Sequence, residues 1–366
     1  MSLVSLLITP TIGGARSANA GRFRAHIFNP MLKIDVHTHI LPREIPRWRD
    51  KFGYGGFIQL QENGPGCARM VRDDGGEFRS VEENCWSPAK RVEEMDALGV
   101  GIQVLSTVPV MFSYWAKPAD GTEIAKFLNQ HVSEIVSEFP LRFIGLGTVP
   151  IQDTALAIKE LERCKQQGLA GVQIGTNINQ LNLGEPQFFD FFKACEETEM
   201  AVFVHPWEMM GESDMQKYWL PWLVGMPAEV SRAICSLIFS GTLEKCPGLR
   251  ICFAHGGGSF PATIGRIDHG FNVRPDLCAI DNAHSPRKYL SRMYFDSLVH
   301  EPAKLDYLIK LVGADQVMLG SDYPFPLGEP QPGKLIESMS YEESIIDMLL
   351  HGSALNWLNM EKVDFQ

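Results

Sequence analysis

Residues 32–39 read LKIDVHTH, a short apolar segment that predicts a buried strand and ends on two histidines. Seven further apolar segments follow, and helix-like amphipathic segments separate them. The eight predicted strands cover residues 32–36, 102–107, 143–149, 171–175, 201–205, 251–255, 293–296 and 317–321. The predicted helices lie near residues 88–98, 121–138, 153–167, 186–199, 227–245, 260–270, 302–312 and 341–351.

This alternation of strands and helices predicts an α/β fold with a parallel sheet buried on both faces. Eight repeats of the unit favour a closed (β/α)8 TIM barrel. An open doubly wound sheet is the alternative, and it would need a glycine-rich phosphate turn after the first strand. His37-Thr38-His39 stands at that point instead, so the barrel is favoured.

The composition is that of an ordinary enzyme-sized globular protein. The 366 residues are 45% hydrophobic and 21% charged, which is enough apolar material for a large core. The net charge of -11 disfavours a nucleic-acid surface. No apolar run reaches the roughly 18 residues of a membrane helix. Eight scattered cysteines without a Cys-x-x-Cys pair predict reduced side chains and a cytoplasmic protein.

Three segments depart from the repeating pattern. Residues 1–30 contain three arginines and no acidic residue, as in a weak mitochondrial transit peptide. A disordered extension or an alternative start at Met31 is the favoured interpretation. Residues 31–366 would form the barrel, with a β-rich insert or lid at 41–86 because that gap is too long for a simple loop. The long loop 206–226 should lie over the same end of the barrel.

Polar residues close several of the predicted strands. His37 and His39 are two positions apart at the end of the first strand, so both imidazoles can face one metal ion. His205 ends the fifth strand, His255 ends the sixth, and Asp322 follows the eighth. Active sites of TIM barrels form at these carboxyl ends of the strands.

A lone histidine near an apolar strand is more often structural than a metal ligand. The strand-end residues taken together reverse that balance, because three imidazoles and a carboxylate suit zinc with an open position for water. The sequence therefore predicts a mononuclear metal site built from His37, His39, His205 and Asp322, with His255 beside it. Iron, cobalt and manganese accept the same donors as zinc.

Longer motifs make the pattern more specific. They are residues 82–86 (EENCW), 105–118 (LSTVPVMFSYWAKP), 218–227 (YWLPWLVGMP), 253–258 (FAHGGG) and 320–328 (GSDYPFPLG). With these motifs, the chain from Met31 nearly to its C-terminus resembles the amidohydrolase-type metal barrels, and among them the 2-amino-3-carboxymuconate-6-semialdehyde decarboxylase family. The resemblance implies zinc as the metal, His255 as the catalytic histidine, and the ligands His37, His39, His205 and Asp322.

The resemblance also implies a small dicarboxylate substrate that is bound by Arg79 and Arg266. One of the two arginines would come from the neighbouring subunit of a homodimer. Guanidinium groups bind carboxylates in a planar two-bond geometry, which suits this role. Without the resemblance, both would be interpreted as surface cations. Three aromatic side chains either line the pocket or pack the loops and the subunit interface: Trp219, Trp222 and Phe325.

The implied reaction is the non-oxidative loss of CO2 from 2-amino-3-carboxymuconate 6-semialdehyde, which gives 2-aminomuconate 6-semialdehyde. In tryptophan catabolism through kynurenine, this step limits the formation of quinolinate and NAD. Two routes remain open: hydroxide adds to the carboxylate-bearing carbon, or that carbon is protonated before the carboxylate leaves. Neither route needs oxygen, a flavin or pyridoxal phosphate.

Two other functions remain open at this point. The first is a one-metal hydratase or hydrolase of an unsaturated diacid or lactone on the same barrel. Two-metal hydrolases of this type use a modified lysine, whereas the fourth predicted strand ends at Gly175-Thr176. The second is a non-catalytic, zinc-stabilised binding protein, which predicts a closed coordination sphere.

Overall fold

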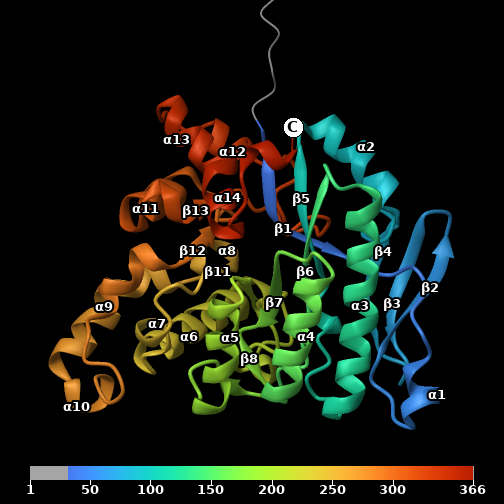
Figure 1. The fold of residues 1–366 in the computed structure, drawn as a ribbon, viewed down its shortest axis with the longest axis horizontal. Helices are drawn as coiled ribbons and strands as arrows, with labels where there is room; N and C mark the ends of the chain where they lie inside the picture. Colours follow the sequence, from blue (N-terminus) through green and yellow to red (C-terminus); the bar gives the residue numbers. More distant parts are fainter. Residues whose placement is uncertain (1–31, 366) are drawn as a thin grey trace, which may run out of the picture. The chain divides into compact units, whose positions relative to one another are not determined.

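The computed structural model describes residues 32–365. Eight parallel strands form one sheet in the order β1-β5-β6-β7-β10-β11-β12-β13 (Figure 1). Seven strands begin within one residue of their predicted starts, and four of them, β6 and the last three, are shorter than predicted. β1 begins two residues later than predicted and continues to Ile40. The bounds are β1 (Ile34–Ile40), β5 (Ile102–Thr107), β6 (Phe143–Gly147), β7 (Gly171–Gly175), β10 (Ala201–His205), β11 (Ile251–Phe253), β12 (Tyr294–Asp296) and β13 (Val317–Met318).

The end of the sheet returns to its beginning. The backbone N–H of Val36 donates to the carbonyl of Leu319 at 2.9 Å, and that of His39 donates to Tyr323 at 2.8 Å. Thr38 and Tyr323 form a parallel bridge between the two segments. The predicted (β/α)8 TIM barrel is therefore confirmed, and the open doubly wound sheet is excluded.

Helices cover the outside of the barrel. α2 (Pro88–Leu98) begins as its sequence indicates, because the Ser87 side chain accepts a hydrogen bond from the Lys90 backbone and Pro88 occupies the first turn. The other main helices are α3 (Pro118–Glu138), α4 (Thr154–Gln166), α5 (Phe189–Glu197), α6 (Met226–Phe239), α9 (Phe260–Val273), α11 (Pro302–Val312), α13 (Glu343–Asp347) and α14 (Ser353–Leu358).

The single helix predicted at 227–245 is wrong. Gly241 has φ 72 and separates α6 from the short helix α7 (Thr242–Lys245). A left-handed residue ends a helix because the following chain can no longer continue its hydrogen bonds, and glycine adopts that conformation without steric cost.

The helical segment that ends in α6 is long and apolar, although two charged residues interrupt it. Pro221–Phe239, which joins the π-helical turn η5 (Pro221–Gly225) to α6, is long and apolar enough to cross a membrane by length and composition alone. Its two charged residues, Glu229 and Arg232, form an ion pair at 2.7 Å. α6 buries apolar side chains against the barrel, as a core helix of a globular domain does.

The barrel core joins strand side chains to α14. Trp357 of α14 is fully buried in the same cluster as Phe203 of β10, and the two ring centroids lie 6.0 Å apart. The Trp357 indole N–H donates to the carbonyl of Arg250 at 3.3 Å, just before β11. Burying a large apolar side chain contributes about 1.5–3 kcal/mol, so α14 helps to hold the strands in register.

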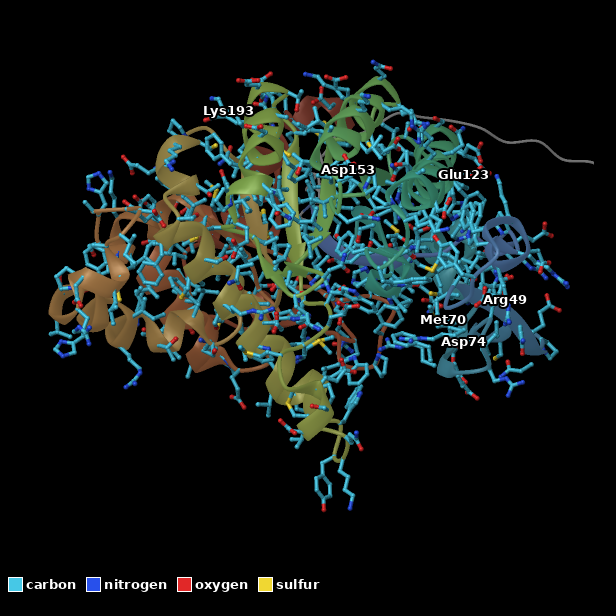
Figure 2. The ribbon with its side chains drawn as sticks, turned by 90° about the horizontal axis from the view of Figure 1, so that it is seen from below. Arg49, Met70, Asp74, Glu123, Asp153 and Lys193 are labelled. Carbon is cyan, nitrogen blue, oxygen red and sulfur yellow. The ribbon has the colours of Figure 1, made fainter. Side chains whose placement is uncertain are left out.

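The segment after β1 forms the predicted β-rich insert. It contains α1 (Trp48–Phe52) and an antiparallel sheet of β2 (Ile58–Gly64), β3 (Cys67–Arg72) and β4 (Glu77–Glu82). Side chains of this sheet and of α3 share one apolar cluster. Figure 2 shows Arg49, Met70 and Asp74 at this edge, away from Lys193 of α5.

The predicted extension at residues 1–30 lies outside the described residues. The eight cysteines are unbonded, and five of them are buried, whereas Cys67 is exposed.

Candidate metal centre

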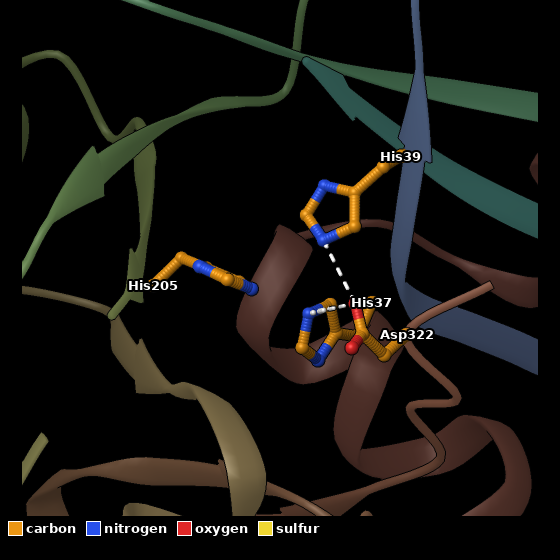
Figure 3. Close-up of side chains that lie close together, drawn as sticks. All are labelled: His37, His39, His205 and Asp322. Atoms are coloured by element: carbon orange, nitrogen blue, oxygen red, sulfur yellow. Dashed lines mark ion pairs between the residues drawn. The ribbon is translucent and has the colours of Figure 1, made fainter. Parts of the chain in front are cut away.

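The four predicted ligands meet at the carboxyl ends of the barrel strands. His37 and His39 project from alternate positions of β1, His205 ends β10, and Asp322 follows β13. One ligand atom of each lies within 4.8 Å of the others, and all four residues are buried (Figure 3). The strands thus bring together residues that are up to 285 positions apart in sequence, His37 and Asp322.

Hydrogen bonds set the tautomer of each imidazole. The Nδ1 atom of His37 faces Asp296 Oδ2 at 2.7 Å, that of His39 faces the Thr107 carbonyl at 3.1 Å, and that of His205 faces the Pro206 carbonyl at 2.9 Å. These oxygens only accept, so each Nδ1 carries a proton. The three Nε2 atoms are buried without a hydrogen-bond partner among the described residues.

Asp322 completes the set. Its Oδ1 lies 3.1 Å from His39 Nε2 and 3.4 Å from His37 Nε2, and its backbone N–H donates to the His37 carbonyl. The residue has φ 60, a left-handed conformation that costs about 1–2 kcal/mol for a residue with a Cβ. The backbone bond to β1 offsets part of that cost and keeps the carboxylate over the histidines.

The electrostatics of the site favour a bound cation. Burial lowers the pKa of His39, and burial together with the neighbouring rings lowers that of His205 well below its usual value. Burial also opposes protonation of His37, but the carboxylates of Asp322 and Asp296 raise its pKa overall. The rings of His39 and His205, whose lowered pKa values favour the neutral form, turn their Nε2 lone pairs toward a site that holds a carboxylate, an arrangement that a divalent cation stabilises. The donor set therefore fits a metal ion.

His255 lies beside this set, on the turn α8 (Ala254–Gly257). Its Nε2 is 3.9 Å from Asp322 Oδ2, and its ring centroid is 5.2 Å from that of His37. The predicted strand 251–255 is wrong at its end, because His255 has φ 56 and ψ 43, and β11 stops at Phe253. This turn directs the backbone away from the sheet and leaves the imidazole partly exposed next to the ligands.

A cavity of about 720 Å³ opens over the metal centre, a size that suits a small molecule. His39, His205 and Asp322 line it, whereas His255 stands outside the lining, next to Asp322. The coordination sphere is therefore accessible from the cavity, unlike the closed sphere of a structural zinc site. The predicted aromatic residues are all part of the lining: Trp219, Trp222 and Phe325.

Arg79 of β4 brings a cation into this cavity. Its guanidinium carbon lies 4.5 Å from the ring centroid of Phe325, 5.0 Å from Phe78 and 5.9 Å from Trp222. No carboxylate among the described residues forms an ion pair with it, and burial lowers its pKa although the charge of Asp322 opposes that shift. Aromatic faces hold the guanidinium without using its N–H donors, so these stay available to a carboxylate ligand.

Comparison with known proteins agrees with this site. The amidohydrolase family model matches residues 34–359. The chain belongs to the amidohydrolase family. This amidohydrolase is similar to the 2-amino-3-carboxymuconate-6-semialdehyde decarboxylase of Dictyostelium discoideum, with 53% identity over 332 residues that cover 90% of this chain and 92% of the relative. The Caenorhabditis elegans protein of the same name is 41% identical over 355 residues, covering 83% and 88%.

Solved structures show the same fold. The 5-carboxyvanillate decarboxylase of Sphingomonas paucimobilis has 28% identity and a TM-score of 0.69, covering 74% of this amidohydrolase and 83% of that chain. The dihydroxybenzoic acid decarboxylase of Polaromonas, solved with bound manganese and an inhibitor, has 21% identity and a TM-score of 0.72, covering 90% and 97%. At that lower identity, the likeness establishes the fold alone.

Arg266 is not brought into the cavity by the single chain. It lies on α9 with an exposed side chain, outside the residues that line the cavity. The structure of one amidohydrolase chain therefore places Arg79, but not Arg266, where it can reach a ligand.

Asp296 is a site residue that the sequence interpretation missed. It ends β12 and accepts a hydrogen bond from Nδ1 of the ligand His37. The signal was present, because Asp296 closes the predicted strand 293–296 as His205 closes 201–205. The position at a strand end does not by itself show that the carboxylate contacts a metal ligand.

Proposed function

We propose that this amidohydrolase is a metal-dependent decarboxylase that converts 2-amino-3-carboxymuconate 6-semialdehyde to 2-aminomuconate 6-semialdehyde and CO2, a step of tryptophan catabolism. One observation carries the proposal: the guanidinium of Arg79, which forms no ion pair within residues 32–365, lines the same cavity as the histidine–aspartate centre. The similarity to two curated decarboxylases of this name supports the choice of substrate. The hydratase alternative has no such support.

Arg79 would orient the substrate. Its two-bond geometry with a carboxylate fixes direction as well as position, which lysine cannot reproduce. Trp222 and Phe325 flank the guanidinium and limit water at this point. A charge-assisted hydrogen bond is stronger in such a site than in bulk water.

Decarboxylation breaks one C–C bond and leaves its electron pair on the substrate. The conjugated semialdehyde can accept this pair once the carboxylate-bearing carbon is saturated, and a proton ends on that carbon in place of CO2. His255, 3.9 Å from Asp322, is placed to hold or move a proton at the edge of the ligand set. A bound divalent cation supplies a Lewis acid that lowers the pKa of water toward neutrality.

Zinc is the metal that we propose for the site. Three imidazole nitrogens and one carboxylate oxygen match its usual donors, and an open position faces the cavity. Metal-free protein reloaded with zinc should recover more activity than protein reloaded with manganese. Recovery with manganese alone would contradict the assignment of zinc.

We also propose a homodimer in which Arg266 enters the partner's cavity, since this exposed cation does not reach its own. Mixing Arg79→Ala and Arg266→Ala subunits tests this. If Arg266 acts in the partner, one site of each mixed dimer is intact, and about one quarter of the activity returns. If both arginines act within one chain, every site carries a defect and no activity returns.

The substrate is tested by comparing two acids. CO2 release from 2-amino-3-carboxymuconate 6-semialdehyde should be far faster than release from 2,6-dihydroxybenzoate. A decarboxylase of the same fold has been solved in complex with this aromatic acid. Turnover of the aromatic acid alone would contradict the proposed substrate but would still show that the protein is a decarboxylase.

A further inference from the structure

The carboxylate of Asp296 contacts both the metal ligand His37 and the turn that carries His255. Its Oδ2 accepts hydrogen bonds from His37 Nδ1 at 2.7 Å and from the His255 backbone N–H at 2.8 Å. Its Oδ1 accepts from the backbone N–H groups of Gly256 at 2.7 Å and Leu298 at 3.1 Å. Asp296 is fully buried, and all four of its partners are N–H donors.

The ring contact determines which nitrogen of His37 faces the metal centre. An ionised carboxylate only accepts hydrogen bonds, so the proton must reside on Nδ1. The Nε2 lone pair then points toward His39 and Asp322, where it has no hydrogen-bond partner. Without Asp296, either tautomer would be available to this ring.

The backbone contacts hold the turn that carries His255. His255 and Gly256 have φ 56 and 58, a region that side chains with a Cβ rarely adopt. Asp296 accepts the N–H groups of both residues, and a Cβ at position 256 would meet Val299 Cγ1 at 2.3 Å. The left-handed turn, and with it the direction of the His255 side chain, therefore depends on this carboxylate.

We propose that Asp296 is a positioning residue that sets both the His37 tautomer and the His255 turn. Metal binding and proton transfer then depend on the same carboxylate. The part that concerns His255 rests on the proposed function. The part that concerns His37 rests on metal binding alone and does not require a known substrate.

Asp35 provides a matched control. It is also a fully buried carboxylate beneath the site, and it accepts the backbone N–H groups of His37 at 3.2 Å and Ser321 at 3.0 Å, together with the Ser321 hydroxyl. An amide at position 35 keeps an acceptor oxygen and can donate to that hydroxyl. An amide at position 296 would point its NH2 group at N–H groups, and two donors cannot form a hydrogen bond. No hydroxyl contacts this side chain, so no partner can change from donor to acceptor.

The test compares Asp296→Asn and Asp35→Asn in the full chain by competitive titration with zinc. The zinc affinity of Asp296→Asn should fall by about 10–100-fold, the usual effect of losing the partner of a ligating histidine. That of Asp35→Asn should stay close to the unchanged protein. At saturating zinc, kcat of Asp296→Asn should fall with little change in KM, because Arg79 is untouched. Equal zinc affinities for the two variants would overturn the proposal.

Nitrogen NMR of the zinc-bound, unsubstituted protein gives a second readout that does not depend on the variant folding. His37 should show a protonated, slowly exchanging Nδ1 and a metal-bound Nε2. Zinc bound through Nδ1, or an unprotonated Nδ1, would contradict the role of Asp296. If the protein released no CO2, the proposed function would fail, whereas the zinc titration and the NMR signal would still decide the assignment of Asp296.

Discussion

The guanidinium of Arg79 is held by aromatic rings rather than by acidic side chains. Phe78, Trp222 and Phe325 contact it, and all four residues line the cavity over the metal centre. A cation without an anionic partner in a partly buried position is costly unless a ligand neutralises it. A surface cation would not need such aromatic surroundings. The environment of Arg79 is therefore that of a carboxylate-binding residue.

Substituting Arg79 should weaken substrate recognition in a specific way. A hydrogen bond to a charged group contributes about 1.5–3 kcal/mol, so Arg79→Ala should lower kcat/KM by roughly 10–100-fold. Arg79→Lys should recover little, because lysine has no planar fork. Arg69→Ala, at an exposed arginine of β3 that does not line the cavity, is the control in steady-state assays. Full activity in Arg79→Lys would contradict two-bond recognition.

The metal ligands predict a stability effect that is independent of the substrate. Zinc bound only to the folded chain should raise the melting temperature, with about 2.7 kcal/mol gained at a free concentration 100 times Kd. His205→Ala should remove this shift, and His284→Ala, at an exposed histidine outside the site, should keep it. Calorimetry with and without a chelator measures both. An undiminished shift in His205→Ala would place the metal elsewhere.

Among the structural elements, the turn after β11 shows what local sequence patterns miss. The apolar run from Ile251 predicts a strand to His255, but β11 stops at Phe253 and the chain makes a left-handed turn at His255 and Gly256. A Cβ at Gly258 would meet the Pro227 carbonyl at 2.3 Å, which explains the glycine at that position. The turn depends on Asp296 and α6, both distant in sequence, so a local pattern cannot reveal it.

The loop after β13 carries a carboxylate that should affect stability with pH. Glu329 accepts the Leu335 backbone N–H at 2.8 Å, but its Oε2 is buried without a partner, and burial raises its pKa above 4.5. The protonated form is favoured in the fold, so its contribution is present below pH 4.5 and is lost as pH rises through the raised pKa.

Glu329→Gln removes this titration. The variant should gain stability relative to the unchanged protein as pH rises from about 4 to 8, because the glutamine stays neutral. Urea unfolding at several pH values measures the difference, with Glu343→Gln at an exposed position as the control. A difference that shrinks with rising pH would show that the ionised form is the better-held one.

In the whole molecule, α14 ties the C-terminal segment to the barrel core through the fully buried Trp357. Trp357→Ala should lower the free energy of unfolding by about 3–5 kcal/mol, since the cavity it leaves lies between Phe203 and the strand ends. Tyr218→Ala, at a side chain that is 82% exposed, should change it by less than about 0.5 kcal/mol. Urea midpoints compare the two, and equal losses would contradict the packing described.

The fold was predictable because each strand and helix carries its own periodic pattern, and the strand-end histidines follow from the barrel. That rule was sufficient to predict the metal ligands His37, His39, His205 and Asp322. Asp296 obeys the same rule, but its role depends on a contact with His37 that no local pattern shows. Arg266 lies outside the cavity because of how the helices and strands pack together, and the sequence around Arg266 does not show that packing.

Decarboxylation of 2-amino-3-carboxymuconate 6-semialdehyde by the metal barrel, with the help of His255, can be measured directly. The measurement adds zinc-loaded protein to freshly generated semialdehyde and follows absorbance and CO2 beside His255→Ala. We predict that the chromophore is lost faster than by spontaneous cyclisation, with one CO2 released for each substrate consumed and no acceleration in the variant. No acceleration by the unchanged protein with zinc bound would contradict the proposed activity, and equal rates in both proteins would contradict the role of His255.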